Sequence, residues 1–287
     1  MQRLLLVGFG DIARRAAPGL ERRFAIHRVS RHDGVDLDRP ETLRFEGADA
    51  VLHLAPPPRT GDSDPRTANL LAALEKVCNP LKKGRILPAR FVYVSTSGVY
   101  GDCGGAQVDE SRPIAPATPR ARRRADVERQ LGAWCADHRT SLTILRAPGI
   151  YAADRLPLER LRAGTPVLRA GDDVYTNHIH ADDLAAAAVR ALEADAPAGV
   201  FNVSDDSEMR MGDWLDLVAD HHGLPRPPRL PRGEIVDFVS KDLYSFMSES
   251  RRLDNRRLKH ELGARLRYPT VHEGLRHAQP AGIDQSS

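Results

Sequence analysis

The stretch "LLLVGFGDIARRA" (Leu4–Ala16) decides the fold, because an apolar run ends at two glycines and is followed at once by helix-forming residues. Consecutive apolar residues before a turn are typical of a strand that is buried on both faces. We expect a strand over Arg3–Val7, a tight turn at Gly8 and Gly10, and a helix over Ile12–Arg22. This order is the first unit of a doubly wound α/β fold.

The same alternation of short apolar runs and amphipathic segments continues along most of the chain. Further strands are predicted at Ala25–Val29, Ala50–Leu54, Arg90–Ser95, Leu142–Arg146 and Val200–Val203. Further helices are predicted at Pro65–Val77, Pro119–Asp137 and Asp182–Ala194. Strands that alternate with helices in this way predict a buried parallel sheet.

The composition of the sequence changes after Ile150, where Pro and Arg become frequent and fewer segments have the pattern of a strand. The run "GLPRPPRLPRG" (Gly223–Gly233) is typical of an extended linker. "NRRLKHELG" (Asn255–Gly263) predicts a short helix, with Asn at its start and Gly just after its end. We therefore expect a second, smaller lobe in the C-terminal part of the chain.

Composition excludes several classes of protein. The 287 residues are 41% hydrophobic and 28% charged, with a net charge of +3, which gives no general reason to expect nucleic acid or a membrane surface as a partner. Cys78, Cys103 and Cys135 lack the spacing of a disulfide framework or a zinc site, so we expect no metal and a reducing cytoplasm. The apolar run at the N-terminus is too short for a signal peptide or a membrane span.

The segment "GFGDIA" (Gly8–Ala13) has the spacing of a dinucleotide-binding turn, with Ala13 in place of the third glycine. Two glycines permit a tight turn and the close approach of a diphosphate, whose charge meets the free N–H groups at the helix N-terminus. Gly8, Gly10, Asp11 and Ile12 are the candidate contacts. The alternative is an ordinary turn between a strand and a helix.

The end of the second predicted strand, "VSRHD" (Val29–Asp33), has no acidic residue at its tip. Ser30 and Arg31 stand there instead, and an arginine can pair with the 2′-phosphate of NADP. This favours NADP as the cofactor, although the nearby Asp33 keeps NAD open.

Two later segments supply further candidate contacts for the dinucleotide. In "VDLD", Asp36 and Leu37 are expected beside an adenine. In "VLHLAPPP", Ala55 and Pro56 follow the third strand and are expected under the cofactor. His53 has apolar neighbours on that strand, and we interpret it as a core residue.

The segment "FVYVSTSGVYGD" (Phe91–Asp102) carries a sharper signature. Together with "GFGDIA", "LRAPGIYAADRLPL" (Leu145–Leu158) and "TNHIHADDLAAA" (Thr176–Ala187), it resembles the extended short-chain dehydrogenase/reductase family, the NAD(P)-dependent epimerases and dehydratases. The resemblance implies a Rossmann-type doubly wound parallel sheet of about seven strands with a smaller C-terminal substrate lobe. It implies a nucleotide-binding domain over residues 1–150, rejoined by 176–203, and a lobe mainly over 151–287.

The resemblance also implies which residues do the chemistry. Thr96 matches the family's hydroxyl residue, which would contact both substrate oxygen and cofactor. The family's catalytic Tyr-x-x-x-Lys aligns with Arg120 and Arg124 in "PATPRARRRADVERQL". A guanidinium has no accessible neutral form, so Arg120 cannot exchange a proton as a tyrosine does. Arg124 is expected to hold the nicotinamide ribose.

Arg120 and Arg124 are four residues apart and so lie on one helical face, where like charges repel unless an anion lies between them. We hypothesise that the pair clamps a phosphate or carboxylate of the ligand, with Glu128 partly neutralising Arg124. Arg122 and Arg123 are interpreted as a solvated face.

The remaining candidates lie in the downstream segments that resemble the family. Pro148, Gly149 and Ile150 are expected beneath the nicotinamide. Tyr100, Tyr151 and Asn177 are candidate substrate contacts, and His178 is a candidate for proton transfer. His180 is interpreted as structural, ahead of a helix capped by Asp182.

The residues and the resemblance predict an NAD(P)-binding oxidoreductase or epimerase-like protein. Its substrate is expected to be a polar small molecule, anionic or similar to a nucleotide sugar, and its proton-transfer group non-standard. A homodimer in the cytoplasm is expected, with no nucleic acid or membrane partner. The alternative is an NADP(H)-binding sensor or partner-binding protein of the same fold that has lost turnover.

Overall fold

The computed structural model describes residues 1–77 and 87–277. Six parallel strands form the central sheet in the order β11-β6-β4-β3-β1-β2. Their bounds are β1 Gln2–Val7, β2 Phe24–Val29, β3 Ala50–His53, β4 Arg90–Thr96, β6 Ser141–Ala147 and β11 Gly199–Asn202. The predicted α/β fold is confirmed, and each predicted strand agrees with an observed strand to within one residue at either end. The family resemblance implied about seven strands, whereas the described residues form six.

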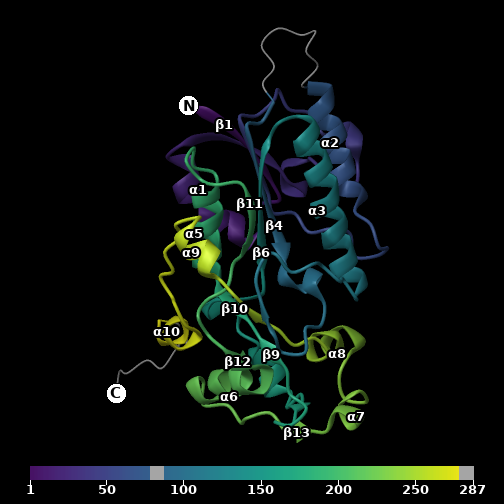
Figure 1. Ribbon diagram of the computed structural model, residues 1–287, viewed down its shortest axis with the longest axis vertical. Coiled ribbons are helices and arrows are strands. Elements are labelled where there is room, and N and C mark those ends of the chain that lie inside the picture. Colours follow the sequence, from purple (N-terminus) through teal and green to yellow (C-terminus); the bar gives the residue numbers. More distant parts are fainter. Residues whose placement is uncertain (78–86, 278–287) are drawn as a thin grey trace.

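Helices cover both faces of this sheet (Figure 1). On one face lie α1 (Asp11–Glu21), α5 (Ala181–Ala191) and α9 (Arg256–His260), and on the other lie α2 (Pro65–Val77) and α3 (Pro119–Asp137). Alternate residues of β1 enter the two cores, because successive side chains of a strand point to opposite faces. Leu4 and Leu6 pack with α1 and α5, while Leu5 and Val7 pack with α2 and α3.

The smaller lobe is built from short elements at the carboxyl ends of the sheet strands (Figure 1). Four two-stranded pairs support it: β5 (Gln107–Val108) with β14 (Arg252–Leu253), β7 (Gly149–Tyr151) with β10 (His178–His180), β8 (Val167–Leu168) with β13 (Arg229–Leu230), and β9 (Tyr175–Thr176) with β12 (Met209–Arg210). The remaining helices are α4 (Leu158–Arg162), α6 (Met211–His221), α7 (Arg232–Ile235), α8 (Lys241–Met247) and α10 (Val271–Arg276).

Three local predictions need correction. The presumed linker Gly223–Gly233 is not extended throughout, because its last two residues begin α7 (Arg232–Ile235), and Arg229 and Leu230 pair with β8 as β13. The side chain that caps α5 belongs to His180, whose Nδ1 accepts a hydrogen bond from the Asp182 N–H at 3.2 Å. The C-terminal part of the chain also returns to the sheet, since Leu258 of α9 is part of the core beside β11.

Two findings bear on the predicted absence of metal and membrane contacts. Among residues 1–77 and 87–277, no group of three or more His, Cys, Asp or Glu side chains is arranged to hold a metal ion. The same residues include no helix that is both long and apolar enough for a membrane span. Cys103 and Cys135 are buried free thiols, and Cys78 lies outside the described residues.

A buried ion pair fixes α3 against the sheet. Arg146 of β6 donates to Glu128 of α3 at 2.7 Å, and each side chain is 7% exposed. The Ser95 hydroxyl donates to the same carboxylate at 2.6 Å. Glu128 therefore pairs with Arg146, which corrects the expectation that it neutralises Arg124. This contact sets the position of the helix that carries Arg120 and Arg124.

We predict that Glu128→Gln destabilises the fold by about 3–5 kcal/mol, because it leaves the Arg146 charge buried without a partner. Urea unfolding followed by circular dichroism measures the change. The double variant Glu128→Leu, Arg146→Met is the control, since it removes both charges, and it should recover most of the lost stability. Equal unfolding midpoints for Glu128→Gln and the parent would contradict this account.

A second buried carboxyl supports the lobe at the end of β11. Asp205 accepts a hydrogen bond from the Ser207 N–H at 2.9 Å, while its other carboxyl oxygen is buried and has no hydrogen-bond partner within residues 1–77 and 87–277. Its backbone N–H donates to the carbonyl of His178 at 2.7 Å. Burial raises the pKa of Asp205 from 3.8 to about 8. The carboxyl is therefore protonated in the folded protein at neutral pH.

The raised pKa predicts a fall in stability as the pH rises. Between about pH 4 and pH 8 the folded protein binds a proton at Asp205 that the unfolded chain has released, so the free energy of unfolding decreases across this window. Urea midpoints at pH 5.5 and pH 8 measure the effect. Asp205→Asn keeps a neutral side chain and should reduce the difference between the two midpoints. An unchanged pH dependence in this variant would refute the assignment.

Candidate functional site

The turn after β1 is built so that only glycine fits. Gly8 has a positive φ of 88°, and a Cβ added to it would lie 2.6 Å from the backbone nitrogen of Ala55. The ends of β1 and β3 are therefore in backbone contact. This is the point where the strand order changes direction, since β2 lies on one side of β1 and β3 on the other. Open α/β sheets bind their ligands at such a point.

The start of α1 is open toward the same place. Gly10 is the N-cap residue and has no side chain to satisfy the first N–H groups of the helix, and a Cβ added to it would meet nothing within 4 Å. Unsatisfied N–H groups at a helix N-terminus attract a diphosphate. These residues fit the diphosphate of a dinucleotide.

A cavity of about 280 Å³ lies over the carboxyl ends of β1, β2 and β3. It brings together most of the residues predicted to contact the adenosine half of the cofactor: Gly8, Gly10, Ser30, Arg31, Asp36, Leu37, Ala55 and Pro56. A larger hollow of about 740 Å³ lies at the amino ends of the strands, beside Arg3 and Phe45. We assign the dinucleotide to the smaller cavity, because parallel sheets bind ligands at the carboxyl ends of their strands.

Two arginines line this cavity, and in the described chain only Arg31 is free to pair with a ligand anion. Asp33 accepts a hydrogen bond from the Ser30 hydroxyl, and the exposed Arg31 has no ion-pair partner within 4 Å in the part of the chain that the structure describes. Arg66 also lines the cavity, but its guanidinium donates to Asp38 at 2.5 Å. The sequence analysis missed Arg66 because its position at the start of α2 has no motif that distinguishes it.

Asp11 and Ile12 do not line the cavity. The Asp11 carboxylate instead pairs with Arg15 at 2.9 Å and with Arg155 of the lobe at 2.8 Å. Arg15 also pairs with Asp154 and Asp182, so the five charges form one cluster beside the first turn of α1. The Asp11 side chain is thus used in joining the two parts of the molecule.

The second end of the site lies where β4 and β6 finish. Thr96 ends β4, and its Oγ accepts a hydrogen bond from the Gly98 N–H at 3.2 Å, which leaves its own proton available for donation. Pro148, Gly149 and Ile150 follow β6 at the same edge of the sheet. Because the strands are parallel, these residues face the lobe together with Gly8 and Gly10.

The arginines of α3 have different surroundings. Arg124 donates to the Tyr93 hydroxyl at 2.9 Å and to the Val94 carbonyl at 3.0 Å, so it is fixed against β4. The guanidinium of Arg120 lies 3.8 Å from the ring centre of Phe246 in α8. Arg123 is buried and donates to the Gly61 carbonyl at 2.6 Å, which corrects its assignment to a solvated face.

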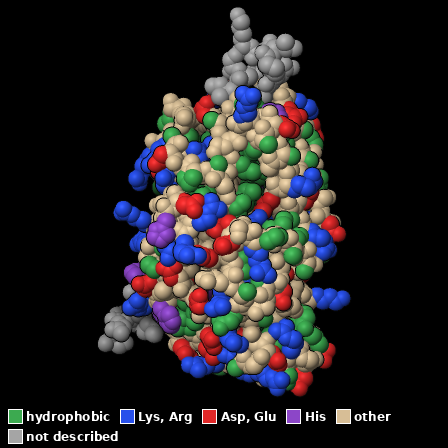
Figure 2. Space-filling model, in the orientation of Figure 1, with side chains coloured by type: hydrophobic (Ala, Val, Ile, Leu, Met, Phe, Trp, Pro, Cys, Tyr) green, Lys and Arg blue, Asp and Glu red, His purple; other side chains and the backbone are tan. Residues whose placement is uncertain are grey.

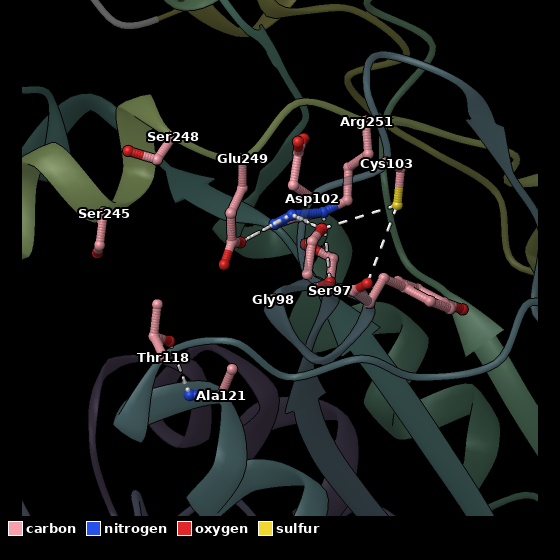
Figure 3. Close-up of polar contacts among 12 residues, drawn as sticks. Ser97, Gly98, Asp102, Cys103, Thr118, Ala121, Ser245, Ser248, Glu249 and Arg251 are labelled. Atoms are coloured by element: carbon pink, nitrogen blue, oxygen red, sulfur yellow. Dashed lines mark hydrogen bonds and ion pairs between the residues drawn. The ribbon is translucent and has the colours of Figure 1, made fainter.

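A buried arginine from the lobe holds the loop that follows Thr96 (Figure 3). Arg251 donates to the Gly101 carbonyl at 3.1 Å and to Glu249 at 2.5 Å. The other carboxyl oxygen of Glu249 is buried without a hydrogen-bond partner in the described chain. The sequence gives no sign of this pair, because both residues lie in a segment without a motif.

Two of the predicted substrate contacts are used inside the protein instead. The Tyr100 hydroxyl donates to Asn202 at 2.9 Å, and its side chain is buried. The amide of Asn177 donates to the Arg251 carbonyl and accepts from the Leu253 N–H. The first bond ties the loop after β4 to β11, and the other two tie Asn177 to the segment at β14, so both side chains are used within the fold, which corrects their assignment to the substrate.

Tyr151 and His178 line a cavity of about 240 Å³ in the lobe. The Tyr151 hydroxyl donates to the Thr270 carbonyl at 3.3 Å, and burial raises the pKa of this phenol well above its usual value. Burial lowers the pKa of His178 to about 3, so its imidazole is neutral at physiological pH. Its Nδ1 is buried without a hydrogen-bond partner among the described residues. A neutral imidazole can form a hydrogen bond to a ligand but is a poor proton donor.

Comparisons with known proteins agree with this architecture. A Streptomyces protein, 3-diazoavenalumate denitrifying reductase, is 31% identical over 132 residues, which are 46% of this chain and 43% of that protein. The chain spans about half the length of the curated relatives it matches, from 43% to 59%.

Many solved structures match nearly the whole chain, and two of them serve as examples. A functionally unknown conserved protein from Silicibacter pomeroyi is 29% identical, with a TM-score of 0.78 and coverage of 97% of this chain and 98% of that one. RMD from Pseudomonas aeruginosa, solved in complex with NADPH, is 20% identical, with a TM-score of 0.72 and the same coverage.

The family model described as "NAD dependent epimerase/dehydratase family" matches residues 13–204, which include β2, β3, β4, β6 and the helices between them. The match covers more than half of the chain and contains Thr96, the whole of α3 and the β7–β10 pair. The chain belongs to the NAD-dependent epimerase/dehydratase family.

Proposed function

We propose that this protein is an NADP(H)-dependent oxidoreductase that transfers hydride to or from a polar, anionic small molecule, such as one similar to a nucleotide sugar. One observation carries the proposal. The residues expected to bind the adenosine half of the cofactor meet in one cavity, and Thr96 and Gly149 lie at the same edge of the sheet. An extended dinucleotide along that edge would bring its reactive end toward the lobe.

When bound, the cofactor supplies or accepts the hydride. Gly8 and Gly10 would bind its diphosphate, and Arg31 would pair with the 2′-phosphate. The backbone at Pro148–Ile150 would lie under the nicotinamide. The Thr96 hydroxyl would donate to the reacting oxygen of the substrate, because its own acceptor is already occupied by the Gly98 N–H.

We propose that Arg120 and Arg124 occupy the places of the family's Tyr and Lys. A guanidinium stabilises negative charge but does not exchange protons near neutral pH. Arg124 is held against β4 and would contact the ribose, while Arg120 would face the substrate. With His178 neutral, the proton must come from water or from the substrate itself. This arrangement suits a reduction in which hydride transfer does not depend on a protein acid.

A second candidate function is that of an NADP(H)-binding sensor or partner-binding protein. The contact of Arg120 with Phe246 favours it, because this cation is covered by the lobe where the family places its catalytic phenol. Titration with NADPH, followed by nicotinamide fluorescence and then by a screen of sugar nucleotides, aldehydes and ketones, separates the two. Binding without any turnover would favour the sensor. The homodimer stays a prediction, which sedimentation tests.

The unpaired charge of Arg31 makes the choice of cofactor testable. We predict that Arg31→Ser weakens NADPH binding by about 10- to 100-fold, because it removes a charge-assisted contact to the 2′-phosphate, while NADH binding changes by less than about threefold. Fluorescence titration with both nucleotides measures this. Arg22→Ser, at the far end of α1, is the matched control. Equal losses for NADH and NADPH would contradict the assignment of Arg31.

The missing phenol can be restored. We predict that Arg120→Tyr with Arg124→Lys raises the reductase rate on carbonyl substrates by about tenfold or more, the usual scale of positioned acid catalysis. Arg120→Phe with Arg124→Lys is the control, because it differs only by the hydroxyl. Rates of NADPH oxidation measure the gain. The same rate in both variants would mean that the site admits no substrate that uses this proton.

A further inference from the structure

Arg160 of α4 is a partly buried cation, and two of its guanidinium nitrogens have no hydrogen-bond partner in the described part of the chain. Its Nε and Nη2 atoms are shielded from solvent and form no hydrogen bond with any residue that the structure describes. Burial alone lowers the pKa of Arg160 to about 10, and no neighbouring charge contributes to the shift. The side chain is therefore still charged at neutral pH. A buried charge without compensation is costly, so it indicates a group that completes the site.

The two unpartnered atoms lie on one edge of the guanidinium. The N–H groups of Nε and Nη2 point in parallel and match the two oxygens of a carboxylate, which they can bind through two hydrogen bonds. The two parallel donors therefore favour a ligand with two coplanar negatively charged oxygens, such as a carboxylate, over a ligand with one neutral acceptor.

The cavity beside Arg160 has apolar and aromatic walls. Its volume is about 240 Å³. The walls are formed by Tyr151, Met211, Trp214, Leu215, Leu243 and Phe246. The cavity also reaches Gly149 and Ile150, the residues expected beneath the nicotinamide. Mostly apolar walls with a few polar groups are typical of a small-molecule site, and aromatic walls suit a flat body.

The charges of the cavity favour a ligand with one negative charge. No Asp or Glu lines it. The only other cation among its described lining residues, Arg155, is already paired with Asp11 at 2.8 Å. One uncompensated positive charge balances a carboxylate, whereas a phosphate dianion would need further donors.

We propose that Arg160 binds the carboxylate of the substrate, whose flat apolar body fills the lobe cavity toward Gly149 and Ile150. Among the anionic substrates that the proposed function allows, this cavity favours a small aromatic or unsaturated carboxylic acid over a nucleotide sugar. The binding of the carboxylate stands on the cavity alone, and the direction of the body toward the reactive end rests on the proposed function. His178 would provide a neutral hydrogen bond beside the body of the ligand through its free Nδ1.

Calorimetry on the full chain tests the proposal, with benzoate and trans-cinnamate as probes and benzamide and cinnamamide as their neutral counterparts. We expect the acids to bind at least about tenfold more tightly than the amides, because only the acids complete the charged pair. Arg160→Met should lose this preference. Arg160→Lys should lose most of it, because lysine keeps the positive charge but lacks the two parallel N–H donors of arginine. Arg162→Met, an exposed residue of the same helix, should behave as the parent.

Several outcomes would overturn the proposal. They are equal binding of acids and amides by the parent, no binding of either, unchanged acid binding in Arg160→Met, or tighter binding of phenyl phosphate than of benzoate. Thermal unfolding gives a second readout, because removing an uncompensated buried charge should raise the melting temperature of Arg160→Met without ligand. A lower melting temperature would also contradict the proposal.

The two proposals fail separately. NADPH titration of Arg160→Met should match the parent, since Arg160 does not line the cofactor cavity. If the parent bound the acids but no nicotinamide nucleotide, the proposed function would fail while the carboxylate site stood. If the parent bound NADPH but showed no preference for acids over amides, the carboxylate site would fail while the proposed function stood.

Discussion

The contact between Gly8 and Ala55 is the constraint on which the rest of the site depends. The two strand ends lie so close that a single methyl group would overlap the backbone nitrogen of Ala55. The turn after β1 lies at the point where β2 is on one side of β1 and β3 is on the other. At this point the first N–H groups of α1 face open space. The carboxyl ends of β2, β3, β4 and β6 then border the same edge, so both ends of an extended dinucleotide have surfaces to meet.

The catalytic end of the site differs in character from the cofactor end. In α3, Arg124 is fixed against β4 and Arg120 lies over the ring of Phe246, at the positions that we propose match the family's Lys and Tyr. Charged groups of this kind orient anions and stabilise negative charge, but they do not shuttle protons. The neutral His178 does not fill the gap. These surroundings support the proposal of binding and hydride transfer without a protein acid.

The fold was predictable because apolar runs and glycine turns carry their own local signal. The run before Gly8, the strand before Thr96 and the helix Pro119–Asp137 all occur where the pattern placed them. The burial and the hydrogen-bond partners of individual polar side chains could not be predicted in the same way. Arg123 and Arg160 have the local sequence of surface residues, yet tertiary contacts bury Arg123 and shield two guanidinium nitrogens of Arg160. Tyr100 and Asn177 follow family motifs, but their hydrogen bonds are made with distant segments.

The charged cluster at the start of α1 has a mechanical consequence. The surface mixes acidic and basic side chains (Figure 2), but here five of them, from three separate segments, meet at one point. Arg155 borders the lobe cavity, and its partner Asp11 opens the helix that faces the diphosphate. The two candidate binding cavities are thus joined by one cluster of ion pairs. Because salt screens such partly exposed pairs, we expect high ionic strength to loosen the lobe from the sheet and to leave Arg155 unpaired beside the lobe cavity.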